Sequence, residues 1–432
     1  MRGRVRFLDV RPLRGSRPFR DLWAGTSASQ LGGQIANVAV LAQVWDLTGS
    51  PVGTGAIGLA TGLPMVLFGL LGGTLADAVD RRALVRITTA GQLLTAVGLC
   101  AQALADSRNV LLLLALVSAG SACGALGAPA RRTFPVRLLP GDQVAAGLAL
   151  TNISFQVAML AGPAVAGLVI ARWDFAAAYA TQAVALAVAM LAVIRLPSMK
   201  PEGKIRAAGG RRRPERGGWA VILRRPTLWG SMATDLSATL LAMPIALFPL
   251  VNETRFEGDP RNLGLFFSAV AVGGITAGLL SGTVTRRRRA GLVQLCAAGV
   301  WGLALACFGL AGPLWLALCC LAVAGAADTV SVVTGSALVQ GETPDAYRGR
   351  VSSVEHVIGV AGPELGNFRG GLLASATSAS FSLVAGGLSA VVAVAAVAAS
   401  NTALRSYRTP SAAVGAAAPG GTGAAASADR AH

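Results

Sequence analysis

Long runs of apolar residues recur along the chain and are separated by short polar segments. A helix needs about 20 residues to cross the hydrocarbon core of a membrane, and the chain contains twelve runs of about this length. They are Leu22–Val44, Ala56–Ala78, Leu84–Ala105, Val110–Ala130, Val144–Ile170, Phe175–Leu196, Thr227–Val251, Leu263–Val284, Gly291–Leu310, Leu314–Val339, Val351–Ala374 and Phe381–Ser400. The pattern predicts an all-α integral membrane protein with twelve transmembrane helices.

The composition supports this prediction and excludes several classes of protein. Of the 432 residues, 53% are hydrophobic and 13% are charged, whereas soluble domains carry about 25% charged residues. All six cysteines fall within apolar runs without the spacing of metal ligands, so we expect them to pack, and we expect neither a metal site nor a cofactor. With two histidines and no nucleotide-binding loop, the chain does not look like an enzyme or an ATP-driven pump.

The net charge of +17 is distributed in a way that predicts topology. Of the 37 Lys and Arg residues, four fall in the segments that lie outside when the N-terminus is cytoplasmic, and Arg369 falls within an apolar run. The four are Arg108, Arg172, Arg255 and Arg261. The positive-inside rule explains this bias, so we expect both termini in the cytoplasm, the lipid bilayer as a partner, and no nucleic-acid partner.

The chain divides into two similar halves. GPAVAG at Gly162–Gly167 matches GPELGN at Gly362–Asn367, and each half has an arginine cluster after its second apolar run. A repeat of six plus six helices is typical of a transporter with its site between the halves. The expected parts are a basic tail at 1–21, a six-helix bundle at 22–196, a basic cytoplasmic linker at 197–218, a second bundle at 219–400 and a disordered cytoplasmic tail at 401–432.

Several motifs resemble those of the major facilitator superfamily. GGTLADAVDRR, from Gly72 to Arg82, resembles the loop between helices two and three of that family. FPVRLLPGDQVAAGLAL, LFPLVNE and QGETPDAYRGRVSSV are similar to its drug-and-siderophore exporter branch, which includes the enterobactin exporter. The resemblance implies two bundles around a central cavity and export of an amphipathic small molecule across a bacterial cytoplasmic membrane by a monomer. A siderophore is the expected substrate, and a macrolide-type or other drug is the alternative.

The resemblance also implies roles for particular residues. The loop residues Gly73, Asp77, Arg81 and Arg82 would brace the outward-facing arrangement as a gate, and the alternative is that they are ordinary cytoplasmic charge. Gly162, Pro163 and Gly167 form the helix-five motif of antiporters, although Ala166 replaces its usual glycine. Because the fourth run also lacks the Arg of many drug antiporters, we do not expect proton coupling through the N-terminal half.

Amide side chains form a stripe on the first apolar run. Ser27, Gln30, Gln34 and Asn37 share one face of a helix, and Asn152 and Gln156 lie four residues apart in the fifth run. Amides that face lipid are costly, so these residues are predicted to line a cavity. Simple helix–helix packing is the alternative.

Four acidic residues fall within the C-terminal runs, namely Asp235, Asp328, Glu355 and Glu364. Burial disfavours the charged form of a carboxylate and lets it exchange protons near neutral pH. We therefore regard Asp328, Glu364 and Asp235 as candidates for coupling to inward protons, and we place Glu355 at the membrane interface. The alternative is static pairing with Arg369, which we otherwise expect to line the cavity. A non-transporting receptor or scaffold remains as a different class of function, against which the polar stripes argue.

Overall fold

The computed structural model describes residues 9–196, 222–284, 289–344 and 347–408, which form helices and no strand in these ranges. In the N-terminal half the elements are α1 Arg11–Gly15, α2 Arg17–Thr48, α3 Pro51–Ala78, α4 Arg81–Leu104, α5 Val110–Arg132, α6 Phe134–Leu138, η1 Gly141–Gln143 and α7 Val144–Ile194. In the C-terminal half they are α9 Pro226–Ala242, η2 Ile245–Leu247, α10 Phe248–Arg255, α11 Pro260–Val284, α12 Ala290–Leu310, α13 Leu314–Glu342, α14 Arg348–Ala376, α15 Ala379–Ser400 and α16 Thr402–Ser406.

Nine segments within these ranges are long and apolar enough to cross a membrane, against twelve expected. One of the nine, Gly141–Ile194, has 54 residues and contains the expected run Val144–Ile170 and most of the expected run Phe175–Leu196. The helices α2 and α14 are not among the nine, since their polar side chains lower the mean hydropathy.

The two runs joined in α7 meet at Asp174, which has φ 80°. A residue other than glycine rarely adopts positive φ, and here the Asp174 carboxylate accepts a hydrogen bond of 2.6 Å from the amide of Phe175. The chain therefore breaks its helical path at the position where the hydrophobic pattern also breaks.

The expected run Thr227–Val251 is broken in the structure. The helix α9 ends at Ala242 and α10 begins at Phe248, with Pro244, which has no amide hydrogen to donate, between them. Arg369 of α14 donates to the carbonyl oxygens of Leu240 and Leu241 at the end of α9. The sequence predicts that Arg369 lines the cavity. In the structure its guanidinium instead pairs with the free carbonyl groups at the end of α9.

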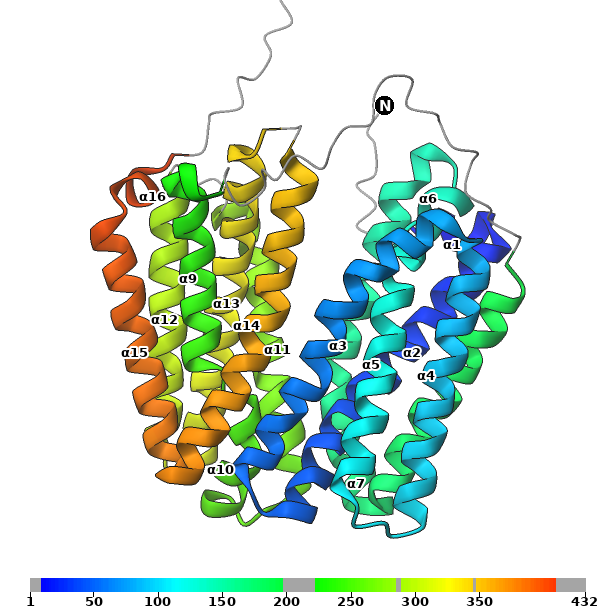
Figure 1. Cartoon of the computed structure of the whole chain (residues 1–432), viewed down its shortest axis with the longest axis horizontal. Helices are drawn as coiled ribbons and strands as arrows, with labels where there is room; N and C mark the ends of the chain where they lie inside the picture. The colour runs from blue at the N-terminus through cyan, green and yellow to red at the C-terminus, as the bar shows by residue number, and fades with distance from the viewer. Residues whose placement is uncertain (1–8, 197–221, 285–288, 345–346, 409–432) are drawn as a thin grey trace, which may run out of the picture.

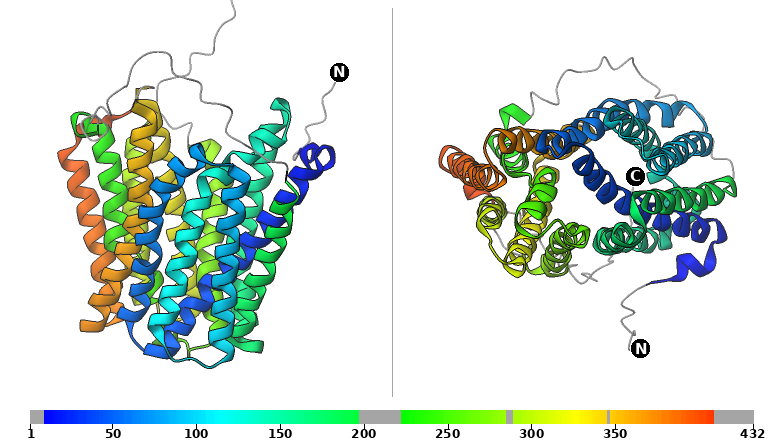
Figure 2. Two further views of the ribbon diagram at one scale, coloured as in Figure 1. Left: turned by 45° about the vertical axis from the view of Figure 1, so that its right-hand side comes forward. Right: turned by 90° about the horizontal axis from the view of Figure 1, so that it is seen from below.

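The helices form two groups, α2 to α7 and α9 to α15, which separate toward the end of the molecule where α1, α6 and α16 lie (Figures 1 and 2). We call this the termini end. Toward the opposite end, α3 packs against α14 and α7 packs against α11. There Thr54 Oγ1 donates to the Ala246 carbonyl at 2.7 Å, and Ser268 Oγ donates to the Leu160 carbonyl at 3.0 Å. The halves are thus joined at one end.

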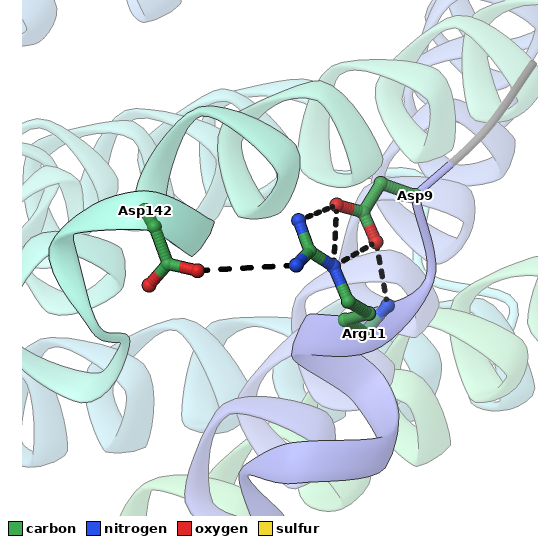
Figure 3. A network of polar contacts seen from close by, with 3 residues as sticks. All are labelled: Asp9, Arg11 and Asp142. Carbon is green, nitrogen blue, oxygen red and sulfur yellow. Dashed lines mark hydrogen bonds and ion pairs between the residues drawn. The ribbon is translucent and has the colours of Figure 1, made fainter. Parts of the chain in front are cut away.

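Both ends of the described chain are tied to their own half. Arg11 at the start of α1 lies 2.6 Å from a carboxylate oxygen of Asp9 and 3.9 Å from one of Asp142 in η1 (Figure 3). The tail expected to be disordered from residue 401 begins with α16, because Asn401 caps this helix and Leu404 is fully buried. The expected linker at 197–218 lies outside the described residues.

Candidate functional site

A cavity of 780 Å³ lies between the two groups of helices, a volume in the usual range for small-molecule sites. The N-terminal half contributes Gln34, Arg132, Met159 and Pro163, and the helices α9 to α14 supply the rest of its lining. The cavity extends to the termini end, where Arg132 ends α5 and where Gln340 and Ser352 lie near the facing ends of α13 and α14.

Three carboxylates from three different helices line the cavity. They are Asp235 of α9, Asp328 of α13 and Glu355 of α14, and Asp235 interacts electrostatically with both of the others. Glu355 Oε1 also accepts a hydrogen bond of 2.6 Å from Ser336. The packing of α14 brings Glu355, which the sequence predicts at the membrane interface, to the cavity together with Asp235 and Asp328.

Two further polar residues of the cavity, both on α12, were not singled out from the sequence. Gln294 and Trp301 are seven residues apart, so they share one face of α12, and both line the cavity. Gln294 is 2% exposed and its Nε2 donates to the Ser231 carbonyl at 3.2 Å. Within the described part of the chain, Gln294 Oε1 and Trp301 Nε1 have no hydrogen-bond partner. The seven-residue spacing of Gln294 and Trp301 was the feature of the sequence that could have identified them as one polar face.

Glu364 lies apart from the three cavity carboxylates, in the contact between the halves. It packs against Gly58 and Gly62 of α3, so closely that a Cβ atom at Gly62 would lie 2.8 Å from Glu364 Cβ. Thr61 and Asn367 interact with its carboxylate. The structure therefore brings Asp235 and Asp328 together but separates them from Glu364.

The predicted amide stripe is divided between the cavity and other surroundings. Gln34 lines the cavity, and Gly162 of α7 lies against its Cβ. The lining described above does not include the stripe residues Gln30 and Asn37, nor Asn152 and Gln156 of α7.

The residues of the helix-five motif lie in α7 and contact α2 on one side and α11 on another. Gly162 faces α2, Pro163 lines the cavity and its carbonyl lies against Gly264, and Gly167 lies against the backbone of Arg261 in α11. Small residues at these positions let the helix backbones approach closely.

The predicted gating residues lie at the termini end of the N-terminal half. Gly73 and Asp77 fall within α3, but the burial and contacts of these two residues lie outside the described part of the chain. Arg81 begins α4, and Arg82 Nη2 donates to the Ile194 carbonyl at the end of α7 at 2.6 Å. The arginine thus connects the loop to another helix of the same half.

Comparison with known proteins identifies the family. The model of the family described as transmembrane secretion effectors matches residues 9–416. The chain belongs to this family. Enterobactin exporter EntS from Shigella boydii serotype 18 is 25% identical over 377 residues, which cover 85% of this chain and 89% of EntS. EntS from Escherichia coli O139:H28 has the same identity and coverage. The protein is accordingly a multi-pass membrane transporter of the major facilitator type and not an enzyme.

Solved structures show the same fold at low sequence identity. The nucleoside transporter NupG has a TM-score of 0.71 at 15% identity, with 90% of this chain and 98% of NupG covered. A bacterial homologue of the human lysosomal transporter Spinster, in an inward-facing and unoccupied conformation, has a TM-score of 0.65 at 17% identity, with 90% and 97% covered. These likenesses concern the fold alone.

Proposed function

We propose that the protein is a secondary active exporter with twelve transmembrane helices in two six-helix bundles that alternate access to the cavity. The observation that carries this proposal is the cavity between the halves, which reaches the termini end while the opposite end is packed. Rocking of one bundle against the other would close the termini end and open the other. A non-transporting scaffold would have no need of this cavity, and a receptor would bind a ligand there without moving it, which the export assay below distinguishes.

The proposed orientation places the termini end in the cytoplasm. Reporters fused after Gly141 in η1 should therefore read cytoplasmic, and a reporter near Asp259, between α10 and α11, should read external. An alkaline phosphatase and green fluorescent protein pair, inserted at each position, makes this measurement. A cytoplasmic reading at Asp259 would overturn the layout.

The proposed substrate is an amphipathic small molecule, with a siderophore favoured by the name of the EntS relatives and a macrolide-type or other drug as the alternative. Cells that lack their own exporters and express this chain should release more enterobactin, or accumulate less erythromycin, than the same cells with an empty vector. If neither differs while the protein is present in the membrane at a normal level, the export of these two substrates is refuted.

Inward protons are the proposed source of energy, with Asp328, Glu364 and Asp235 as the groups that exchange them. All three are half-buried, and Glu364 lies between helices that must separate when the packed end opens. Its carboxylate would then become hydrated, which links its protonation to the conformation. Gly73, Asp77, Arg81 and Arg82 would stabilise the opposite, outward-facing arrangement as a gate at the termini end. A single chain forms the whole cavity, so a monomer is sufficient.

A further inference from the structure

The cavity carries a charge opposite to that of the chain. The chain has a formal net charge of +17, yet the described lining contains the carboxylates of Asp235, Asp328 and Glu355 and only one guanidinium, that of Arg132. Arg132 lies at the end of α5 and is exposed, whereas the three carboxylates are half-buried. An anionic ligand in the cavity would meet like charge away from bulk water, which opposes its binding.

Polar atoms without partners lie among these carboxylates. Gln294 is 2% exposed and Trp301 is 5% exposed, and both line the cavity. Gln294 Oε1 accepts no hydrogen bond and Trp301 Nε1 donates none within the described residues. Because most buried polar groups in folded proteins are paired, two unpaired atoms at the cavity wall indicate a ligand with a polar or charged group beside them. The indole ring of Trp301 is also the aromatic surface best suited to a cation.

The carboxylates do not form a metal site. No group of three or more His, Cys, Asp or Glu residues in the described part of the chain is arranged to hold a metal ion. The acids therefore surround a larger space instead of chelating a small ion. The rest of the wall combines uncharged polar side chains with an apolar part that includes Met159, Met232, Met243 and Phe267.

We infer that this wall is a binding site for an amphipathic organic cation. Asp235, Asp328 and Glu355 attract its positive charge, Gln294 and Trp301 contact the charged group, and the methionines and Phe267 contact its apolar body. The inference rests on the proposed export function and, of the two substrate classes proposed there, selects the drug, as a basic amphipathic molecule, over the siderophore. It can fail while the export function stands.

A pair of probes with the same shape and opposite charge tests the inference. Tetraphenylphosphonium is a cation, and tetraphenylborate is an anion of nearly the same size. Equilibrium dialysis against the purified full chain in detergent should show that the cation binds at least about tenfold more tightly than the anion. Equal binding of the two ions, tighter binding of the anion, or no binding of the cation would overturn the inference.

Substitutions locate the site. Asp328→Asn, Asp235→Asn and Glu355→Gln should each weaken binding of the cation by about fivefold or more. Glu355→Gln replaces an aspartate variant that fails to fold. Asp142→Asn is the matched control, because Asp142 lies in η1 beside Arg11, outside the cavity. Size-exclusion chromatography checks that each variant is folded. Unchanged affinity in folded variants would refute the site, and the export assay with enterobactin and erythromycin then judges the export function separately.

Discussion

The N-terminal half contributes one amide and one exposed arginine to the polar wall of the cavity. The C-terminal half contributes the three carboxylates of the described cavity wall. The two halves nevertheless have similar helical layouts and pack across the same interface (Figure 1). The two repeats thus share a helical arrangement, while the acidic side chains of the described cavity wall all lie in one half. In the proposed transport cycle, the helices of the N-terminal half would serve mainly as the surface against which the C-terminal half moves.

Both halves contain buried amides whose oxygen has no partner within the described residues, but the one of these that lines the cavity, Gln294, belongs to the C-terminal half. In the N-terminal half, Tyr179 Oη donates to Gln43 Oε1 at 2.7 Å and Gln102 Nε2 donates to the same oxygen at 2.9 Å. In the C-terminal half, Gln294 leaves its Oε1 without a partner in the described residues, at the cavity. A buried amide whose hydrogen bonds are made within the protein stabilises the fold, and one that faces a cavity unpaired is available to a ligand.

The largest expected effect comes from Glu364→Gln, which tests whether the C-terminal half alone couples transport to protons. The amide retains the size of the side chain but carries no exchangeable acidic proton, so uphill transport in proteoliposomes with an imposed pH gradient should fall by at least about tenfold. Exchange of substrate without a gradient should continue, because Glu364 is not part of the described cavity wall. The control is Asp142→Asn. Normal uphill transport by Glu364→Gln would show that this acid has a structural role.

A smaller effect is expected from Gly58→Ala, which tests the surface that the N-terminal half offers. A Cβ atom there would lie 2.6 Å from the Glu364 carbonyl oxygen, whereas Gly69 in the same helix has nothing within 4 Å. Overpacking of this kind costs about 1–3 kcal/mol, which should shift the protein away from the present conformation and slow transport severalfold.

Gly69→Ala is the matched control for this prediction, since both substitutions raise the helix propensity of α3 by the same amount. Spin-label distances across the packed end provide the measurement. If the two variants behave alike, close packing of α3 against α14 is not needed for the transport cycle.

The smallest effects are expected at the two chain ends. Asn401 is 3% exposed, accepts from the Leu404 amide at 2.9 Å and donates to the Pro226 carbonyl at 2.6 Å. Ser16 is half-buried and accepts from the Phe19 amide at 3.3 Å. Loss of a helix cap costs about 0.5–2 kcal/mol, and we expect Asn401→Ala to lie at the upper end and Ser16→Ala at the lower end. Thermal unfolding in detergent measures both, and a larger loss at Ser16 would contradict this order.

The positions of the helices were largely predictable from the sequence. The expected run Val110–Ala130 corresponds to α5 at Val110–Arg132, and Phe381–Ser400 corresponds to α15 at Ala379–Ser400. The break at Pro244 and the helical start of the C-terminal tail were not predicted, because the break ends α9 within an apolar run and α16 depends on Asn401 and on the burial of Leu404 against Gly291. Both depend on contacts with distant segments.

The sequence by itself determined that the chain spans a membrane and where its apolar segments begin and end, because the thickness of the bilayer acts on each segment separately. Only the tertiary structure decided which side of each helix faces the cavity. Glu355 and Glu364 both belong to α14, yet one lies at the cavity and the other lies between the halves. The sequence of α14 has polar residues on more than one side of the helix, and the packing of the neighbouring helices decides which side faces the cavity.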